Sequence, residues 1–400
     1  MGVDWTQLPP EILEFISTKL KIYTDYLRCR AVCTSWRSSI PKTPFHLPPQ
    51  LPWLMLPPSR SHQSHRSHRA FYDLSTHKFR YLSFPESFNP NKRHCGSSHG
   101  WLIILDDSPS ILLLNPLSRA KLLLPPLSTF PNVDGFNYSD IGKEYSLRSP
   151  SGGRYNRNLR QMRDSFIKKI VLSANPSKDP HFVAIAILNQ TGELAYCRNG
   201  DKAWRFIEGA QSYSEDVIYC KGLCYAVDKH GGILACDVRD DLPRISFIET
   251  PRKLGGDMQY LVYSEPEDEL LLVTRYLDLD INFELAQSYL IFRTKRFEVS
   301  RLVSSGPHWE KVKSLNDKML FIGENSSLSL SACDFTGCLG NCIYYTDDYS
   351  ETNYDGAFGE HDIGIYKLWD GSIEPLPCYP RNSYFRLGWP TPLWVALSPC

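Results

Sequence analysis

The spacing of hydrophobic residues changes from helical to strand-like near residue 70 of the chain. In the first part, Ile12, Ile16 and Leu20 recur at intervals of four residues, which places them on one face of an amphipathic helix. Proline is tolerated in the first turn of such a helix, and Glu11 lies near its positive end. We therefore predict that a helix starts within residues 8–11.

Two more short helices are expected before residue 42. Thr24 or Asp25 can cap the second helix, and the third is expected to run from Cys33 to just before Pro41. The buried side of the second helix is expected to carry Leu27, Ala31 and Val32. Domains this small usually need a metal, disulfides or a partner. The bundle is therefore expected either to pack on the rest of the chain or to dock surplus apolar surface on another protein.

Residues 43–69 are predicted to form a connector between two domains. Seven prolines from Pro41 to Pro58 prevent a helix and favour an extended, semi-rigid chain. The apolar segment 53–56 is expected to be a short strand or a docked segment of the second domain, which would hold the two domains at a fixed distance. Residues 59–69 carry three histidines among serines and arginines and indicate a solvated loop, with metal binding and a localisation or phosphate-contacting role as alternatives.

From residue 70 onward, short apolar runs are separated by turn residues, which is typical of an all-β domain. Three groups of four runs, within 167–207, 217–248 and 259–303, each have about the length of one propeller blade. In the last group, strands are expected at 259–264, 269–276, 288–294 and 297–303. The predicted fold is mainly β: a three-helix module followed over 70–400 by a β-propeller of six or seven blades. Two successive two-sheet sandwiches are the alternative.

The segment 131–164 interrupts the strand pattern. It is polar, contains four glycines and carries a small excess of basic side chains. A connection of this length is usually either functional or disordered. We predict an exposed insertion loop between blades, with partner binding as a possible role.

Two motifs in the helical module, about twenty residues apart, resemble the F-box. They are Leu-Pro-Pro-Glu-Ile-Leu at 8–13 and Arg-Ala-Val-Cys-Thr-Ser-Trp-Arg at 30–37. The resemblance implies a three-helix bundle over 1–42 that binds a Skp-type adaptor and, through it, a cullin scaffold and a ubiquitin-conjugating enzyme. Carried over by position, the adaptor-binding residues are Leu8, Pro9, Ile12, Leu13, Ile16, Val32, Cys33 and Trp36. Some of these side chains can instead hold the bundle together.

The second domain resembles that of a large family of plant F-box proteins. The matching motifs are Cys-Gly-Ser-Ser-His-Gly-Trp-Leu at 95–102, Asn-Pro-Leu-Ser at 115–118, Leu-Pro-Pro-Leu at 124–127 and Trp-Pro-Thr-Pro-Leu-Trp-Val at 389–395. This resemblance implies a kelch-like β-propeller, also described as a domain of unknown function, that recognises substrates. The paired glycines at 231–232 and 255–256 lack the regularly spaced Tyr and Trp of true kelch repeats, so kelch partners such as actin are not inferred.

Charge and hydropathy narrow the classes of partner. The chain has 44 basic and 44 acidic side chains, which argues against an electrostatic grip of the whole surface on nucleic acid or on a membrane. No apolar run reaches the roughly 18 residues of a membrane span, and residues 1–5 do not resemble a secretory leader. Twelve cysteines without such a leader indicate reduced thiols. We therefore predict an intracellular protein of the nucleus or the cytoplasm.

The sequence offers no convincing motif for catalysis. It lacks a Walker phosphate-binding loop, a G-x-S-x-G elbow and a His-Glu-x-x-His pair. Acidic pairs at 106–107, 240–241 and 347–348 are expected at turns, where Asp stabilises the backbone. The cysteines at 220–224 and 333–342 are irregularly spaced for zinc, and buried strand thiols are the simpler interpretation. We predict no catalytic residue, no cofactor and no metal.

These observations favour a substrate-recognition subunit of a cullin-based F-box ubiquitin ligase, which bridges the Skp-type adaptor and an unidentified protein substrate. Such a subunit acts by proximity and needs no covalent chemistry of its own. The alternative is a propeller scaffold that uses the adaptor without ubiquitin transfer. A propeller enzyme would instead require ionisable side chains with shifted pKa values that converge at the central channel.

Overall fold

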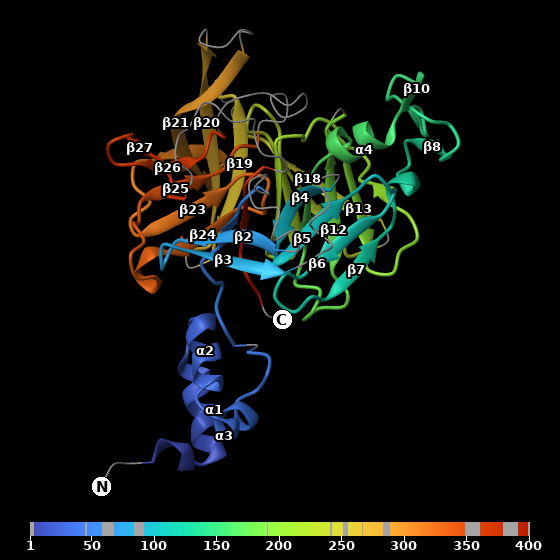
Figure 1. Ribbon diagram of the computed structural model, residues 1–400. Coiled ribbons are helices and arrows are strands. Elements are labelled where there is room, and N and C mark those ends of the chain that lie inside the picture. The colour runs from blue at the N-terminus through green and yellow to red at the C-terminus, as the bar shows by residue number, and fades with distance from the viewer. Residues whose placement is uncertain are drawn as a thin grey trace.

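The computed structural model describes residues 4–44, 46–57, 68–83, 92–189, 191–240, 242–250, 255–265, 267–282, 289–348, 361–378 and 391–398. A helical bundle precedes a ring of β-sheets, and Figure 1 shows the bundle standing off one side of the ring. The bundle consists of η1 (Trp5–Gln7), α1 (Pro10–Lys19), α2 (Tyr23–Arg30) and α3 (Thr34–Ser39), which confirms the predicted helical module. None of the described helices is long and apolar enough to cross a membrane.

The interior of the bundle is small. Leu13, Tyr26 and Ile40 are its fully buried apolar side chains. The hydroxyl of Tyr26 donates a hydrogen bond to the carbonyl oxygen of Pro41 at 2.7 Å, so this ring fills the interior while its polar end is satisfied. The prediction for the buried side of α2 was wrong, because the structure exposes Leu27, Ala31 and Val32.

A glutamine of the connector is bonded to the start of α2. Neither Thr24 nor Asp25 caps α2, contrary to expectation. Instead, Gln50 of the connector accepts the backbone N–H of Tyr23 at 2.8 Å and donates from its Nε2 to the carbonyl oxygen of Lys21 at 2.9 Å. This side chain therefore satisfies a free backbone donor at the start of the helix.

The apolar part of the connector belongs to the β domain, as predicted. It contains β1 (Trp53–Met55), which pairs with strands from both ends of the domain. Residues 59–67 of the histidine-rich stretch lie outside the described residues, so its predicted loop is not described. Residues 68 and 69 begin the next strand.

Within the described chain, six sheets of four or five strands form the blades of a β-propeller (Figure 1). From the inside outward, blade 1 contains β28 (Leu393–Val395), β1, β2 (His68–Asp73) and β3 (Lys78–Ser83). In the same order, blade 2 contains β4 (Arg93–Ser98), β5 (Trp101–Leu105), β6 (Ile111–Leu114) and β7 (Lys121–Leu124). Blade 3 contains β11 (Ile167–Leu172), β12 (Val183–Leu188), β13 (Leu194–Arg198) and β14 (Arg205–Phe206). Blade 4 contains β15 (Asp216–Cys220), β16 (Leu223–Val227), β17 (Ile233–Asp237) and β18 (Arg244–Ile248).

The last two blades are less regular. Blade 5 contains β19 (Met258–Ser264), β20 (Glu269–Asn282), β21 (Tyr289–Val303) and β22 (His308–Val312). Blade 6 contains β24 (Leu328–Ser331), β23 (Lys318–Ile322), β25 (Cys342–Tyr345), β26 (Gly364–Lys367) and β27 (Ile373–Glu374), with a short helix η5 (Ala332–Asp334). The pairing of β23 with β25 is parallel, whereas the other described strand pairs are antiparallel.

The ring is closed by pairing strands that are distant in sequence. β28 pairs with β1, with Trp394 opposite Leu54, and thereby completes blade 1. Successive blades meet through their innermost strands. Around the ring, β28 contacts β4, β4 contacts β11, β11 contacts β15, β15 contacts β19, and β19 contacts β24. This arrangement confirms the propeller and excludes the pair of sandwiches.

The strand prediction for blade 5 was partly wrong. Residues 289–294 and 297–303, which were predicted as parts of two strands, belong to one strand, β21, and the fourth strand of the blade is β22. Lys295 and Arg296 separate the two runs in sequence, but they lie on a continuous strand that pairs along β20 across a bulge. Figure 1 shows the resulting long hairpin of β20 and β21 projecting on the side of the propeller away from the bundle.

The insertion at 131–164 is folded, although a loop was predicted. After a short helix η4 (Leu127–Thr129), it forms a three-stranded sheet of β8 (Val133–Phe136), β9 (Tyr145–Arg148) and β10 (Arg154–Arg157), followed by α4 (Leu159–Ser165). Asn158 and Gln161 form a capping box at the start of α4. Buried side chains such as Leu147 and Met162 pack into the core shared by blades 2 and 3, which explains why the polar segment is ordered.

Candidate functional site

The bundle carries an apolar surface that the propeller leaves open. Five large apolar side chains are between 41% and 62% exposed, and we call them the bundle surface: Trp5, Ile12, Phe15, Leu27 and Val32. Figure 1 shows the bundle clear of the blades, and an exposed ion pair of 4.0 Å between Lys21 and Asp334 bridges the two domains. The apolar side chains are therefore not covered by packing on the rest of the described chain.

The eight predicted adaptor-binding residues fall into three environments. Pro9, Ile12 and Val32 are exposed, Leu8, Ile16, Cys33 and Trp36 are half-buried, and Leu13 is buried. Because the side chain of Leu13 is 0% exposed in the interior of the bundle, it has no surface to offer a partner. Trp36 and Cys33 also support the bundle, since the Nε1 of Trp36 donates to the carbonyl oxygen of Trp5 at 2.9 Å and the Sγ of Cys33 caps α3.

Three members of the bundle surface are not among the eight predicted adaptor-binding residues. These are Trp5, Phe15 and Leu27. Phe15 follows Ile12 by three residues and therefore lies beside it on α1, a spacing that could have been read from the sequence. No comparable local pattern marks Trp5 or Leu27.

A second candidate site lies at one mouth of the propeller channel. It is a small pocket lined by charged and polar residues from five blades, among them Arg93, Lys168, Asp216, Gln259, Glu324 and Asp348. Arg93, Lys168 and Asp216 occur within the first two residues of β4, β11 and β15. Because the innermost strands lie side by side around the ring, their first residues converge at the same end of the channel.

The pocket lies on the side of the propeller away from the bundle. β19 begins at Met258, which pairs with Arg275, and ends at Ser264, which pairs with Glu269 at the start of β20. β20 continues past Arg275 to Asn282 in the hairpin that projects away from the bundle (Figure 1). The start of β19, which lines the pocket, therefore points the same way.

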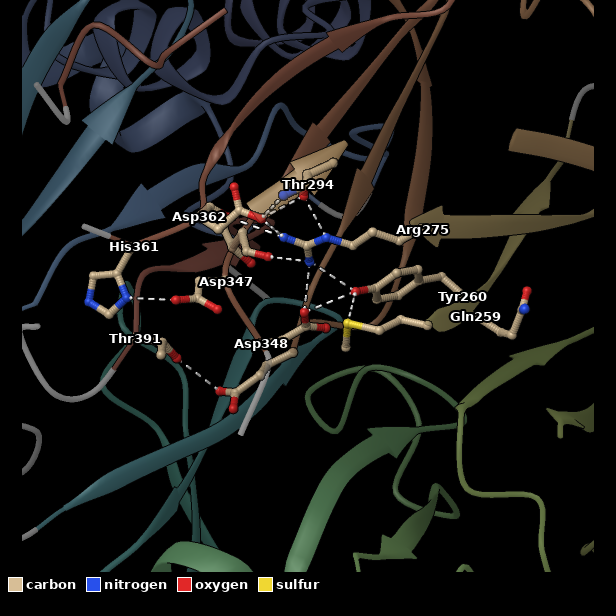
Figure 2. A network of polar contacts seen from close by, with 12 residues as sticks. Gln259, Tyr260, Arg275, Thr294, Asp347, Asp348, His361, Asp362 and Thr391 are labelled. Atoms are coloured by element: carbon tan, nitrogen blue, oxygen red, sulfur yellow. Dashed lines mark hydrogen bonds and ion pairs between the residues drawn. The ribbon is translucent and has the colours of Figure 1, made fainter. Parts of the chain in front are cut away.

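Arg275 organises a buried cluster beside the pocket. Its Nη1 donates to the Oδ1 of Asp348 at 2.9 Å and to the hydroxyl oxygen of Tyr260 at 3.1 Å, while its Nη2 donates to the Oδ2 of Asp362 at 2.9 Å. Its Nε donates to the Oγ1 of Thr294 at 2.8 Å. Figure 2 shows Asp362 and Thr294 on one side of the guanidinium and Asp348 with Tyr260 on the other.

This cluster joins blades 5 and 6 across their boundary. Arg275 is 1% exposed. Although its burial opposes the charged form, Tyr260, Asp362 and Asp348 together raise the pKa of the guanidinium well above its ordinary value. Burial conversely raises the pKa of Asp348, with Arg275 acting against that shift. Removing the cation would therefore leave two buried carboxylates without their main partner.

The acidic pairs behave differently from one another. Asp106 accepts the backbone N–H of Ser108 at 2.8 Å, which is the predicted turn role. The prediction was wrong for the pair at 347–348, because Asp347 contacts the Nδ1 of His361 at 3.2 Å and Asp348 binds Arg275 (Figure 2). Residue 241 of the third pair lies outside the described residues.

Glu324 is a weakly paired carboxylate at the pocket. Its side chain is 12% exposed, and its described contacts are Arg93 Nη2 at 3.5 Å and Thr391 Oγ1 at 3.3 Å. Burial raises the pKa of Glu324 to about 7, an effect that Arg93 opposes and Asp348 reinforces. Gly323 precedes it with a φ of 146°, and a Cβ there would collide with the Oγ1 of Thr346, so the turn that presents Glu324 needs glycine.

The cationic side chains of the pocket are already bonded to other groups of the protein. Lys169 forms a buried ion pair of 2.6 Å with Asp216. The Nζ of Lys168 donates to the carbonyl oxygen of Ser214 at 2.8 Å. Arg93 donates from its Nη1 to the carbonyl oxygen of Ile167 at 2.6 Å, and this hydrogen bond is shorter than its contact with Glu324.

The pocket meets in part the condition set for a propeller enzyme, because ionisable side chains converge at the channel and Glu324 has a shifted pKa. Its described lining contains no Ser, Cys or His. No group of three or more His, Cys, Asp or Glu in the described part of the chain is placed to hold a metal ion. The arrangement can therefore hold or exchange a proton and bind a charged group.

Comparisons with known proteins agree with both domains. A family model described as F-box-like matches residues 5–43, and one described as KIB1-4 beta-propeller matches residues 71–367. The chain is 30% identical to F-box protein SKIP23 of Arabidopsis thaliana over 98% of this chain and 96% of that one. It is 26% identical to F-box protein At2g17036 of the same plant, over 99% and 96% of the two chains.

Among solved structures, TolB from Acinetobacter baumannii aligns with a TM-score of 0.39 and 11% identity, covering 92% of this chain and 71% of that one. The match to the propeller family spans most of the chain, and the F-box-like match accounts for the helical bundle before it. The chain therefore belongs to the plant family of F-box proteins that carry a KIB1-4 β-propeller.

Proposed function

We propose that this chain is the substrate-receptor subunit of a cullin-based F-box ubiquitin ligase. The bundle surface would bind a Skp-type adaptor, and the propeller would bind a protein substrate. The observation that carries the proposal is the open bundle surface, whose five apolar side chains are 41–62% exposed in a bundle with three fully buried ones. Covering the exposed parts of five such side chains would contribute on the order of 5 kcal/mol to association.

The relative position of the two candidate sites supports this role. The pocket faces away from the bundle, so a substrate held there would not compete for space with an adaptor on the bundle. The connector is braced by Gln50 at the start of α2 and by β1 within blade 1, which favours a fixed separation of the two sites. A receptor of this kind acts by holding substrate lysines near the conjugating enzyme.

We propose a non-catalytic role for the chain. Glu324 is the observation that favours catalysis, because a carboxyl whose pKa lies near 7 can act as a general acid or base. Two of its acidic neighbours at the described pocket, Asp348 and Asp216, are held by Arg275 and Lys169 in ion pairs. No serine, cysteine or histidine accompanies Glu324 in the described lining. The proposed role also places the chain inside the cell, in the nucleus or the cytoplasm.

The proposal is tested by pull-down of a purified Skp-type adaptor with the full-length chain. Ile12→Asp and Phe15→Asp place a charge on the bundle surface without touching the bundle interior, and we expect each to reduce adaptor recovery about 10-fold or more. Leu123→Asp is the matched control, because Leu123 is 70% exposed on the propeller. Full recovery by folded Ile12→Asp and Phe15→Asp proteins would overturn the proposal.

A scaffold without ubiquitin transfer would pass the same adaptor test. The two roles are separated by depleting the protein and following the half-lives of the partners that bind its propeller. A receptor predicts longer half-lives on depletion, whereas a scaffold predicts no change.

A further inference from the structure

The turn between β8 and β9 of the insertion is braced by its own hydrogen bonds. The backbone N–H of Asn137 donates to the carbonyl oxygen of Glu144 at 2.9 Å and closes the turn. Glu144 is 7% exposed, and its carboxylate accepts the N–H of Gly142 at 2.9 Å and that of Leu159 at 3.2 Å. Because Leu159 is the first residue of α4, the same carboxylate also fastens the turn to the helix. A loop that is ordered beforehand loses less conformational freedom on binding.

The braced turn carries two large apolar side chains at its surface. Ile141 is 88% exposed, the highest value among the large apolar side chains of the described chain, and Tyr138 is 57% exposed. The ring of Tyr138 packs edge-on against that of Phe136 at 4.6 Å, and Phe136 packs on the core shared by blades 2 and 3. One exposed apolar residue is ordinary for a protein surface, but two that share one braced turn offer a defined contact surface.

Three arginines of the insertion are exposed, whereas the carboxylates that pair with them are covered. Asp134 binds Arg148 at 2.6 Å and Arg154 at 3.2 Å, and its side chain is 19% exposed, compared with 55% and 78% for the two arginines. The side chain of Asp164 is 8% exposed and lies 3.5 Å from Arg160, whose side chain is 70% exposed. This part of the insertion therefore presents cations to solvent rather than carboxylates.

The turn has the same imbalance of charge. Lys143 is exposed beside Ile141, while the carboxylate of Glu144 is turned to the backbone N–H groups of the insertion. Asp140 is exposed and accepts a hydrogen bond from the side chain of Asn137 at 3.2 Å. Four exposed cations thus accompany the two apolar side chains, and we call the six together the insertion surface: Tyr138, Ile141, Lys143, Arg148, Arg154 and Arg160.

The insertion lies on the side of the propeller away from the bundle. Figure 1 shows β8, β10 and α4 at the rim of the ring, on the opposite side from the helices of the bundle. Leu147 and Met162 anchor the insertion in the core shared by blades 2 and 3, so its surface has a fixed place on the propeller. An adaptor on the bundle surface and a partner on the insertion surface therefore do not compete for space.

An acidic protein segment with apolar side chains matches this surface in charge and in polarity. The cations are too few to grip nucleic acid by charge alone, since the segment 131–164 carries six basic and four acidic side chains. They also lie apart, because Arg148 and Arg154 pair at one end of the three-stranded sheet and the turn lies at the other end. An extended peptide spans such a surface, whereas a single phosphate group does not.

We propose that the insertion surface is a docking site for an acidic segment of the protein substrate. Apolar side chains of that segment cover Tyr138 and Ile141, and its carboxylates pair with the exposed cations. The inference rests on the proposed receptor function, because it names the chemistry of the substrate that the propeller would hold.

The test measures binding of short fluorescent peptides to the full-length chain. One pool alternates Asp or Glu with Leu, Ile or Phe. A second pool has Lys or Arg at the acidic positions, and a third has Ser or Asn at the apolar positions. We expect the acidic–apolar pool to bind about 10-fold more tightly than the other two, and its affinity to fall as salt is added. Equal binding of the three pools, or no binding of the acidic–apolar pool, would overturn the inference.

Two other anionic probes separate a protein partner from nucleic acid and from membrane. They are a single-stranded oligouridine RNA and vesicles that contain phosphatidylserine. We expect both to bind more weakly than the acidic–apolar pool. Tighter binding of either probe than of that pool would overturn the inference, in favour of nucleic acid or of a membrane surface.

On the protein side, Ile141→Ser and Lys143→Glu change exposed side chains of the insertion surface. Each is expected to weaken binding of the acidic–apolar pool about 5-fold. Leu242→Ser and Lys313→Glu are the matched controls, because both residues are exposed on other blades, and they should leave the affinity unchanged. Unaltered affinity in folded Ile141→Ser and Lys143→Glu, or an equal loss in the controls, would overturn the inference.

The adaptor pull-down separates this inference from the proposed function. Ile141→Ser is expected to recover the adaptor as well as the unmodified chain does, because the insertion and the bundle lie on opposite sides of the propeller. Loss of adaptor binding in Ile12→Asp together with equal binding of the peptide pools would sink the docking inference and leave the receptor proposal standing. Adaptor binding that survives in Ile12→Asp and Phe15→Asp would sink the receptor proposal whatever the peptides do.

Discussion

Replacing Glu324 by glutamine is expected to stabilise the propeller at alkaline pH much more than at acid pH. Burial raises the pKa of Glu324 from 4.5 to about 7, against the effect of Arg93. The native protein therefore holds this proton more tightly than the unfolded chain does. The corresponding stability is fully present below about pH 4.5 and is lost as the pH rises through about 7.

The size of the effect follows from the interval between the two pKa values. At about 1.4 kcal/mol per tenfold change in proton affinity, ionising Glu324 in the native state costs about 3 kcal/mol in all. The side chain is only 12% exposed, so solvent screens this cost little. Over the range from about pH 5 to pH 8, the free energy of unfolding of the unmodified protein should fall by about 2.5 kcal/mol relative to that of Glu324→Gln.

Urea denaturation of both proteins across this pH range measures the difference directly. Glu310→Gln serves as the control, and its difference from the unmodified protein should stay within about 0.5 kcal/mol at every pH. A free-energy difference between Glu324→Gln and the unmodified protein that does not change with pH would refute the reasoning. It would mean that Glu324 is ionised at little cost and is better compensated than its contacts indicate.

Three further predictions follow from the packing. Arg275→Met should lower the free energy of unfolding by about 3–5 kcal/mol, because two buried carboxylates lose their cation. As a control, Arg301→Met at an exposed position should lower it by less than about 1 kcal/mol, and equal losses in the two variants would contradict the role of the cluster. Deleting residues 392–400 removes β28 and should abolish the cooperative unfolding transition seen by circular dichroism, while an unchanged transition would show that blade 1 closes without it. Gln50→Ala should cost about 1 kcal/mol and speed hydrogen exchange at the Tyr23 amide, and unaltered exchange would argue against the brace.

The architecture could be predicted from the sequence because its signals are local. The spacing of Ile12, Ile16 and Leu20 marks a helix within one segment, and groups of four apolar runs mark blades within forty to fifty residues. Strand ends were less predictable. The charged pair Lys295-Arg296 resembles a turn, but it lies on the continuous strand β21, because β20 pairs with β21 on both sides of a bulge at Lys295.

The side of α2 that faces the interior could not be derived from polarity. Tyr26 is buried in place of the more apolar Leu27, because its hydroxyl reaches the carbonyl oxygen of Pro41 at 2.7 Å. That partner lies 15 residues away, and its position depends on the path of α3 and the connector. A helical pattern identifies an apolar face, but tertiary contacts decide which face is covered.

The pocket could not be predicted at all. Its members run from Arg93 to Asp348 and occur as single residues or runs of two or three, with no motif around them. They meet only because the ring closes and aligns the innermost strands. The pair at 347–348 illustrates the difficulty, since its sequence resembles an ordinary turn while Asp348 pairs with Arg275 from the neighbouring blade.

The central claim is that the bundle surface is a binding surface for another protein. Calorimetric titration of a purified Skp-type adaptor into the full-length chain tests it most directly. The account predicts saturable binding of one adaptor per chain, and loss of that binding in Ile12→Asp but not in Leu123→Asp. A folded, unmodified chain that releases no heat of binding and retains no adaptor would contradict the account.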